Sequence, residues 1–225
     1  MKININYIDN NIIISNDKVL SLEIENKSYF YRVVNDFNNI TKDSSIKNIN
    51  FYDDNGKELE LSNKINVIID YFNIDFNSKK ILNMLYKSLK DEIDEITNTQ
   101  INTYYNKIKK IIFKKLINFN LLLSINEEYE IDTIFKLLKI SIDCKDSLLD
   151  NLLLLIDIEN LLKINELIVL VNIKQYLSSD ELAELYKYSL YNGVKVLLID
   201  SQNYKMTIER EKKIIIDSNL DEFLI

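Results

Sequence analysis

The stretch that decides the fold is Leu167-Ile168-Val169-Leu170-Val171, followed by a helical segment and then by Val194–Ile199. Both ends of this stretch are short apolar runs, typical of strands buried on both faces of a sheet. Between them, Ser178 and Glu181 have the spacing of a capping box, and Asn192-Gly193 is a typical helix stop. A strand, a helix and a second strand of this length predict a right-handed βαβ unit with parallel strands.

Strands are also expected in the first part of the chain, residues 1–76, where apolar and polar residues alternate. The pattern predicts a helix at Ser28–Asn38 and strands at Lys2–Ile8, Ile12–Ile14, Val19–Ile24, Asn48–Tyr52, Lys57–Leu61 and Ile65–Ile69. Asp54-Asn55-Gly56 predicts a hairpin with a type I′ turn, because Asn-Gly tolerates positive φ. Lys213–Ile216 and Phe223–Ile225 are expected to add edge strands.

Residues 77–162 have a different pattern, with apolar residues at helical spacing. One stripe runs from Ile81 to Ile96 and a second from Ile101 to Leu116, and further helices are expected near Thr133–Ile140 and Asp146–Leu162. The predicted fold class is therefore α/β. Residues 1–76 and 163–225 would form a discontinuous α/β head domain, and residues 77–162 an inserted α-helical leg domain.

The composition of the 225 residues excludes much enzyme chemistry. There is no His, so Ser-His and Cys-His couples and His-ligated zinc are excluded. The single cysteine, Cys144, excludes an internal disulfide and fits a reducing compartment. With two glycines and no G-x-x-x-x-G-K-[ST] motif, a phosphate-binding loop cannot be built, and no bound nucleotide is expected.

Charge and hydropathy predict a soluble cytoplasmic protein. No apolar run approaches the roughly 20 residues that cross a bilayer, so no membrane contact is expected. The N-terminus alternates like a strand and lacks the apolar block of a signal peptide. A net charge of −7 argues against nonspecific coating of nucleic acid, although it leaves room for a segregated basic face.

One enzymatic alternative is a Mg²⁺-dependent nuclease. Asp17 and the later Glu25-Asn26-Lys27 match a loose D…E-x-K pattern, in which two carboxylates hold the metal and Lys27 steadies the attacking water. Such a match arises easily by chance in a chain rich in Asp, Glu and Lys. A polar strand end and helix entry is the simpler interpretation.

The acidic stretch at 127–132 is a candidate metal site. Four carboxylates in six residues repel one another unless they are solvated or neutralised, and Ca²⁺ takes oxygen ligands of this kind. The simpler interpretation is an acidic first turn that complements a helix dipole. The four residues are Glu127, Glu128, Glu130 and Asp132.

Basic residues concentrate in the second apolar stripe. They spread around much of the expected helix, so a solvated surface is the simple interpretation and contact with phosphates the functional one. Arg32 and Lys27 are further candidates for DNA contact. With only two arginines in the chain, any DNA binding should tolerate many sequences. The clustered residues are Lys107, Lys109, Lys110, Lys114 and Lys115.

Taken together, these features resemble a known family. The segment from Glu128-Tyr129-Glu130-Ile131-Asp132 to Lys139 resembles the acidic loop and following helix of the small ring-forming adaptation protein of type II-A CRISPR systems, the Csn-two family. Leu167–Asn172, Tyr176–Leu182 and Val194–Asp200 resemble its last βαβ unit. The similarity extends over essentially the whole chain, by pattern more than by identity.

The resemblance implies a specific function. Members of this family form homotetrameric rings of α/β heads and helical legs, and the head resembles an ATPase core without a working phosphate loop. They bind Ca²⁺ through acidic residues near the legs and hold double-stranded DNA in a lysine-lined hole. They act in spacer acquisition beside the integrase pair and the effector nuclease, without catalysis of their own. By position, Glu128 and Glu130 match acidic residues of the family loop, and Asp132 is a third candidate ligand.

Overall fold

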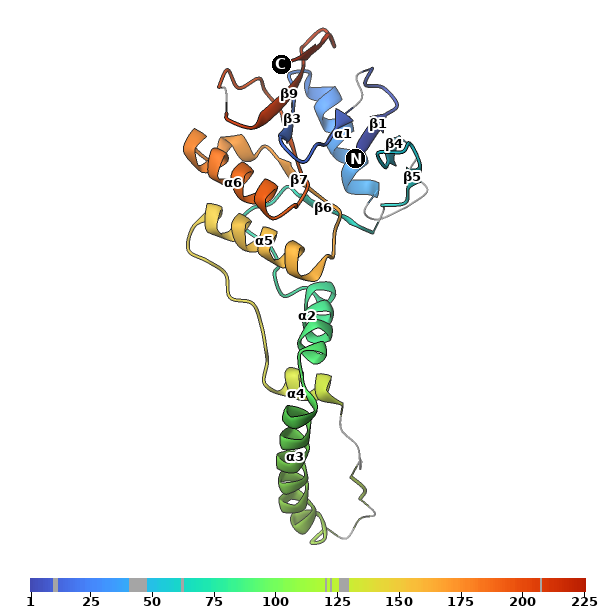
Figure 1. The fold of residues 1–225 in the computed structure, drawn as a ribbon, viewed down its shortest axis with the longest axis vertical. Coiled ribbons are helices and arrows are strands. Elements are labelled where there is room, and N and C mark those ends of the chain that lie inside the picture. The colour runs from blue at the N-terminus through green and yellow to red at the C-terminus, as the bar shows by residue number, and fades with distance from the viewer. Residues whose placement is uncertain are drawn as a thin grey trace. The chain divides into compact units, whose positions relative to one another are not determined.

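The computed structural model describes residues 1–9, 12–40, 48–61, 63–119, 121, 123–125, 130–206 and 208–225. The chain forms two compact units, one of residues 1–75 and 144–225 and the other of residues 76–143 (Figure 1). Helix α5 (Leu148–Leu162) belongs to the first unit, although its sequence placed it in the predicted leg domain. It packs on α6 (Ser179–Tyr191), where the Tyr188 hydroxyl donates to Asp157 at 2.6 Å. The α/β unit therefore resumes near residue 144, before the predicted boundary at 163.

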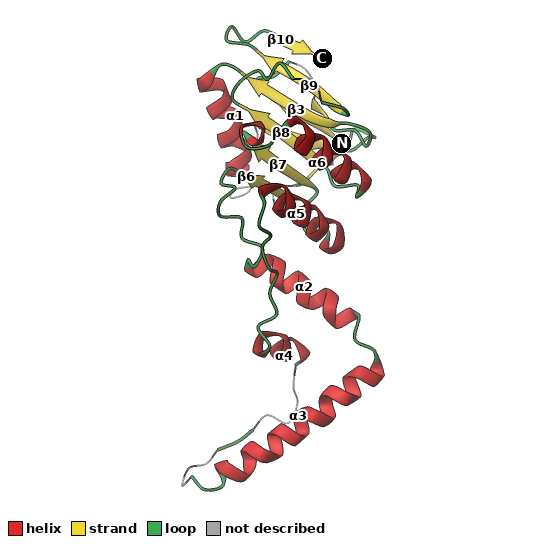
Figure 2. Ribbon diagram, turned by 90° about the vertical axis from the view of Figure 1, so that its left-hand side faces the viewer, coloured by secondary structure: helices red, strands yellow, loops and turns green. Residues whose placement is uncertain are grey.

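A six-stranded sheet organises the first unit, in the order β10-β9-β3-β8-β7-β6 (Figure 2). All neighbouring strands are parallel except β10, which pairs antiparallel with β9. The predicted strand–helix–strand unit is present as β7, α6 and β8, and β9 is an interior strand rather than the expected edge. The strands are β3 (Val19–Ile24), β6 (Ile65–Ile68), β7 (Leu167–Val171), β8 (Val196–Asp200), β9 (Glu211–Ile216) and β10 (Glu222–Leu224).

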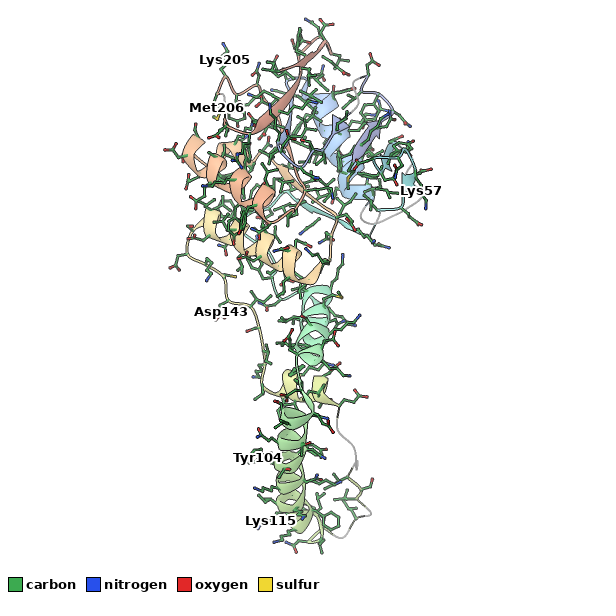
Figure 3. The ribbon with its side chains drawn as sticks, in the orientation of Figure 1. Lys57, Tyr104, Lys115, Asp143, Lys205 and Met206 are labelled. Carbon is green, nitrogen blue, oxygen red and sulfur yellow. The ribbon has the colours of Figure 1, made fainter. Side chains whose placement is uncertain are left out.

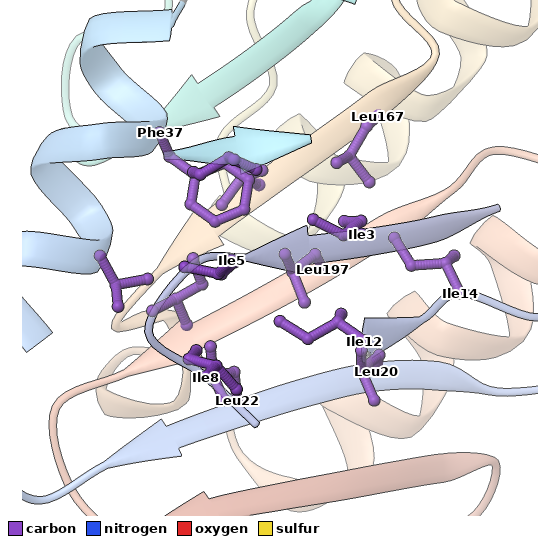
Figure 4. Packing of buried hydrophobic residues seen from close by; sticks show 14 of the residues in the cluster. Ile3, Ile5, Ile8, Ile12, Ile14, Leu20, Leu22, Phe37, Leu167 and Leu197 are labelled. Atoms are coloured by element: carbon purple, nitrogen blue, oxygen red, sulfur yellow. The ribbon is translucent and has the colours of Figure 1, made fainter. Parts of the chain in front are cut away.

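The main core lies on one face of this sheet. A second, four-stranded antiparallel sheet and α1 (Lys27–Ile40) pack against this face. Elsewhere, the short 3₁₀ helix η1 (Ile173–Gln175) follows β7. The second sheet has the order β2-β1-β4-β5, with β1 (Lys2–Ile5), β2 (Ile12–Ile13), β4 (Ile49–Tyr52) and β5 (Glu58–Leu59). Figure 4 shows Ile3 and Ile5 of β1 packed against Leu20, Leu197 and Phe37. Alternation along each strand sends these residues to one face and their neighbours to the other.

The hairpin between β4 and β5 is present, but its turn differs from the predicted type I′. Gly56 has φ 80°, whereas Asn55 is not among the residues with positive φ. The Gly56 N–H donates to the Asp53 carbonyl, and the Asp53 carboxylate accepts from the backbone of Asn55 and Lys57. This is a type I turn followed by a glycine bulge. The Asp53 carboxylate thus provides a hydrogen-bond acceptor for the backbone N–H groups of Asn55 and Lys57 within the turn.

The second unit contains α2 (Lys79–Asp91), α3 (Glu95–Leu116) and α4 (Ile131–Leu137). Its buried core is small, with Tyr86, Ile131 and Phe135 at the centre. The predicted stripe from Ile81 to Ile96 is broken between α2 and α3, because Asp94 caps a new helix there. Among the described residues, no helix is long and apolar enough to cross a membrane.

Candidate nucleic-acid interface and acidic loop

Helix α3 is unusually exposed for its length. None of its 22 residues is buried. The Asp94 carboxylate starts the helix by accepting the Thr97 N–H at 2.6 Å, and Ile101 packs beside Tyr86 and the other core residues of this unit. From Tyr104 to Lys115, both labelled in Figure 3, the helix presents apolar and basic side chains to the surface.

Three of the five predicted lysines share one side of α3. At about 100° per residue, positions 107, 110 and 114 fall within about 60° of one another around the helix axis. The Lys107 ammonium lies 5.0 Å from the centre of the Tyr104 ring. Lys109 is half-buried and points away from this side, and Lys115 lies about 80° from Lys107. We call the three residues Lys107, Lys110 and Lys114 the lysine face.

The two other candidates for DNA contact lie in the first unit. Lys27 is the exposed first residue of α1. Arg32, one turn further, has its guanidinium carbon 3.9 Å from the centre of the Tyr7 ring, a cation–π contact. Tyr7 is itself fixed because its hydroxyl donates to Asp36, which is buried. Arg32 is therefore exposed, with its guanidinium lying over the Tyr7 ring.

The acidic stretch is only partly within the described residues. Glu127 and Glu128 lie outside them. Glu130 is exposed at the start of α4 and makes no capping hydrogen bond through its side chain, and Asp132 lies in the first turn. One oxygen of Asp132, Oδ1, is buried without a hydrogen-bond partner. Such an oxygen costs free energy unless a donor or a cation meets it, so the donor set fits a hard cation such as Ca²⁺.

The nuclease hypothesis does not fit the fold. Asp17 precedes β3 and Glu25 follows it, so the two carboxylates lie at opposite ends of the strand. The six residues of β3 alone span roughly 20 Å, whereas Mg²⁺ needs its ligands at about 2.1 Å. Within the described part of the chain, no three Asp, Glu or Cys side chains are grouped closely enough to hold a metal. The predicted D…E-x-K site is wrong.

The turn after β3 also bears on nucleotide binding. Only Glu25 and Asn26 separate the end of β3 from the start of α1. A phosphate-binding loop needs several residues whose backbone N–H groups curl around the phosphate. The connection between β3 and α1 contains only two residues, which are too few to form such a loop.

A hollow lies at the opposite end of β3, where Asp17 precedes the strand. It is a cavity of about 1070 Å³ whose lining includes Asp17, Glu184, Lys187, Tyr191 and Arg210. Its lining includes both acidic and basic side chains, so it presents no surface of one charge to a polyanion such as DNA.

Sequence reasoning missed a network of buried charges on the face of the six-stranded sheet opposite the main core. The Lys174 ammonium lies 2.7 Å from Glu23 Oε1 and 2.5 Å from Glu211 Oε1. The Lys213 ammonium lies 3.1 Å from Glu23 Oε1. None of these side chains is more than 9% exposed. We call Glu23, Lys174, Glu211 and Lys213 the buried charge network.

The sequence contains a signal for this network. In Val19–Ile24, polar Ser21 and Glu23 alternate with leucine and isoleucine, which places them on the same face of β3. Glu23 is further held by the Tyr204 N–H at 3.0 Å, and Glu211 by the Tyr186 hydroxyl at 2.9 Å. Buried charges are retained when they are paired and hydrogen-bonded in this way.

Asp200 lies beside the network, opposite Glu23 in the pairing of β3 with β8. It is fully buried, and neither carboxylate oxygen has a hydrogen-bond partner in the described structure. Burial raises the pKa of Asp200 to about 7, against the attraction of Lys174. Near neutral pH, Asp200 therefore exchanges between a neutral and a charged form inside the protein.

The raised pKa of Asp200 predicts a pH-dependent stability. Between about pH 4 and pH 7 the unfolded carboxylate has lost its proton and the folded one retains it, so the free energy of unfolding falls as pH rises. At about 1.4 kcal/mol per pH unit, the loss between pH 5 and pH 8 should be about 2–3 kcal/mol. Asp200→Asn should remove this loss. Urea unfolding of both proteins at the two pH values checks it, and an offset that is equal at pH 5 and pH 8 would contradict it.

The comparisons with known proteins agree with the resemblance seen in the sequence. The sequence profile described as CRISPR-associated protein (Cas_Csn2) matches residues 41–220. The chain is 28% identical over 205 residues to the CRISPR-associated protein Csn2 of Streptococcus agalactiae, and the match covers 89% of each chain. Its fold is similar to the crystal structure of Stu0660 of Streptococcus thermophilus, with a TM-score of 0.60 and 14% identity over 100% of this chain and 76% of that one.

A further similarity carries less weight. The putative ATP-binding protein of an ABC transporter from Pyrococcus furiosus has a TM-score of 0.43 and 12% identity over 95% of this chain and 97% of that one. A score this low does not support the predicted ATPase-like character of the α/β unit.

Proposed function

Because this chain belongs to the CRISPR-associated Csn2 family, we propose that it is a non-enzymatic protein of CRISPR spacer acquisition that binds double-stranded DNA. In this proposal the chain works in the cytoplasm as a Ca²⁺-stabilised homotetrameric ring threaded on linear DNA. Its partners would be the integrase pair and the type II effector nuclease. The α/β unit would be an ATPase-like core that has lost its phosphate loop, as the two-residue turn after β3 suggests.

The observation that carries the DNA-binding proposal is the lysine face. Lys107, Lys110 and Lys114 follow one another along about 10 Å of α3, without an acidic residue between them. Lysine ammonium groups attract phosphates irrespective of base sequence. Readout of guanine by arginine forks would need more arginines than Arg32, which lies on Tyr7, and Arg210. The surface therefore suits sequence-independent binding.

The calcium part of the proposal depends on Glu130 and Asp132, with Glu128 as the family match. A bound Ca²⁺ would neutralise carboxylates that otherwise repel one another and would supply a partner for the buried Oδ1 of Asp132. Because these residues flank the start of α4, which packs on α2, a cation there would also stabilise the second unit. The expected role of the ion is assembly, not catalysis.

Removing calcium should lower both the assembly state and the stability of this unit. We expect light scattering after size-exclusion chromatography to show a homotetramer with Ca²⁺ and smaller species with a chelator. The pair Glu130→Gln and Asp132→Asn should behave like the chelated protein even with Ca²⁺ present. Asp143→Asn, an exposed carboxylate in the same unit, is the matched control and should assemble normally. A monomer that is indifferent to Ca²⁺ would refute the calcium-dependent ring.

Ring closure makes a separate prediction about DNA topology. A closed ring can thread onto linear duplex through its ends but not onto a covalently closed circle. We therefore expect much tighter binding to linear DNA than to a relaxed circle of the same sequence, measured by filter binding at equal nucleotide concentration. Equal affinity for both would argue against threading while leaving open contact between duplex and the lysine face.

A further inference from the structure

The buried charge network and Asp200 together carry an unbalanced charge. The described residues there contribute three carboxylates but two ammonium groups, and each of these side chains is at most 9% exposed. Both ammonium groups are already shared by Glu23 and Glu211. When Asp200 is ionised, one buried negative charge therefore has no counter-charge of its own, which is costly inside a protein. The carboxylates are Glu23, Glu211 and Asp200, and the ammonium groups are those of Lys174 and Lys213.

Oxygen atoms near this charge also lack hydrogen bonds. Both carboxylate oxygens of Asp200, the Ser21 hydroxyl and the Tyr204 hydroxyl are buried without a hydrogen-bond partner among the described residues. The Ser21 and Asp200 side chains are themselves fully buried. Native proteins leave few buried polar atoms unsatisfied, so such atoms indicate a bound water molecule or ion.

These oxygens come from one face of the six-stranded sheet. Glu23 of β3 is paired with Asp200 of β8, and Ser21 lies two residues before Glu23, so all three side chains project to the same face. Tyr204 follows β8 and donates its N–H to Glu23 at 3.0 Å. Its ring centre lies 5.9 Å from the Lys174 ammonium. Tyr204 therefore packs on the buried charge network beside Asp200.

The other titratable groups that face Asp200 do not balance its charge. Lys174 attracts the carboxylate but is shared by two glutamates. The three tyrosines that face it are neutral at pH 8, because burial raises the pKa of each hydroxyl. The groups around Asp200 are Tyr71, Tyr186, Tyr204, Glu23, Lys174, Glu211 and Lys213.

The chemistry of these groups favours a cation of single charge. A water molecule would supply hydrogen bonds but not the missing positive charge. A divalent ion prefers several carboxylates, and no three acidic side chains in the described part of the chain are grouped to hold a metal. One free carboxylate with neutral hydroxyl oxygens instead balances a single positive charge.

We propose that an alkali-metal cation, sodium or potassium, binds at Asp200 when this carboxylate is ionised, with Ser21 and Tyr204 as neutral oxygen ligands. The cation takes the place of the proton that Asp200 holds at lower pH, so the two compete for one position. All three residues lie in the first unit, so the proposal does not depend on the lysine face or on the calcium ligands of the second unit. The role of the cation is to stabilise the α/β unit above neutral pH.

Urea unfolding in different salts tests this site. The wild-type protein, in alkali-free buffer with a calcium chelator, is unfolded at pH 8 in sodium, potassium or choline chloride at equal ionic strength. Choline is too large to enter a buried site, so at least one alkali salt at about 0.2 M should lower the equilibrium constant for unfolding by about tenfold relative to choline. At pH 5 the three salts should act alike, because a proton occupies Asp200. Equal stability in the three salts at pH 8, or the same difference at pH 5, would overturn the proposal.

Two variants locate the effect. Asp200→Asn keeps the size of the side chain but removes its charge, so this variant should unfold alike in the three salts at pH 8. Glu25→Gln is the matched control, since Glu25 is an exposed carboxylate directly after β3, and it should keep the response of the wild type. A salt response that survives Asp200→Asn, or one that Glu25→Gln abolishes, would refute a cation site at Asp200. Loss of DNA binding or of calcium-dependent assembly leaves these measurements unchanged and bears on the proposed function alone.

Discussion

Replacing Lys107, Lys110 and Lys114 together with glutamate should lower the affinity for linear duplex DNA by about 10²–10³-fold at low salt. Each lysine that contacts a phosphate releases about one counterion, and each reversal adds repulsion where attraction was lost. The slope of log affinity against log salt should therefore become shallower by about three. Titration of a fluorescent duplex at several salt concentrations measures both quantities.

The control for this variant lies in the same unit. Lys79, Lys87 and Lys90 are exposed on α2, and their replacement with glutamate gives the same change in net charge. If the lysine face makes direct contacts, the α2 variant should lose only a small part of the affinity, through long-range repulsion that salt removes. Equal losses for the two variants would mean that overall charge, and not this face of α3, determines binding.

Lys174→Met should lower the free energy of unfolding by about 3–5 kcal/mol at pH 7. Removing the ammonium leaves Glu23 and Glu211 close together in a buried site, with only Lys213 to balance them. Their mutual repulsion and incomplete solvation both destabilise the folded state. Urea unfolding followed by circular dichroism measures the change.

Two further variants make this prediction specific to the buried network. Lys64 lies 3.8 Å from Glu166 in an exposed pair, and Lys64→Met should change the free energy of unfolding by less than about 1 kcal/mol. Adding Glu211→Gln to Lys174→Met removes one uncompensated charge, so the double variant should be less destabilised than the sum of the single ones. A loss below about 1 kcal/mol for Lys174→Met would show that the network contributes little.

Much of the α/β unit could be predicted from local patterns. The apolar run at Leu167–Val171 and the capping box at Ser178 and Glu181 form the β7 and α6 that were expected. The turn at Gly56 was located correctly but assigned to the wrong type, because the Asp53 side chain accepts backbone N–H groups and changes the preferred geometry. Residues 146–162 were predicted as a helix, but nothing in their periodicity shows that they pack on α6.

The candidate site was predicted in part. The cluster from Lys107 to Lys115 was evident in the sequence. Because α3 is continuous from Glu95 to Leu116, helical geometry places Lys107, Lys110 and Lys114 on one side and the other two lysines elsewhere. The pairing of Asp17 with Glu25 was wrong, because the residues between them form the extended strand β3, which places the two carboxylates at its opposite ends. The calcium ligands remain a prediction. The buried, unpartnered Oδ1 of Asp132 and the exposed Glu130 nearby in the sequence are consistent with it, whereas Glu128 lies outside the described residues.

The sequence by itself determined most of the helices and strands and the absence of histidine chemistry, since periodicity and composition are properties of the chain itself, and the segments at 128–139 and 167–200 carried the resemblance to the family. Tertiary structure decided which charges meet. Glu23, Lys174 and Glu211 are far apart in the sequence and become partners only because β3 and β9 lie side by side, with η1 at the end of β7. Strand order depends on the total apolar surface that the whole unit buries, so it cannot be predicted from any local sequence pattern.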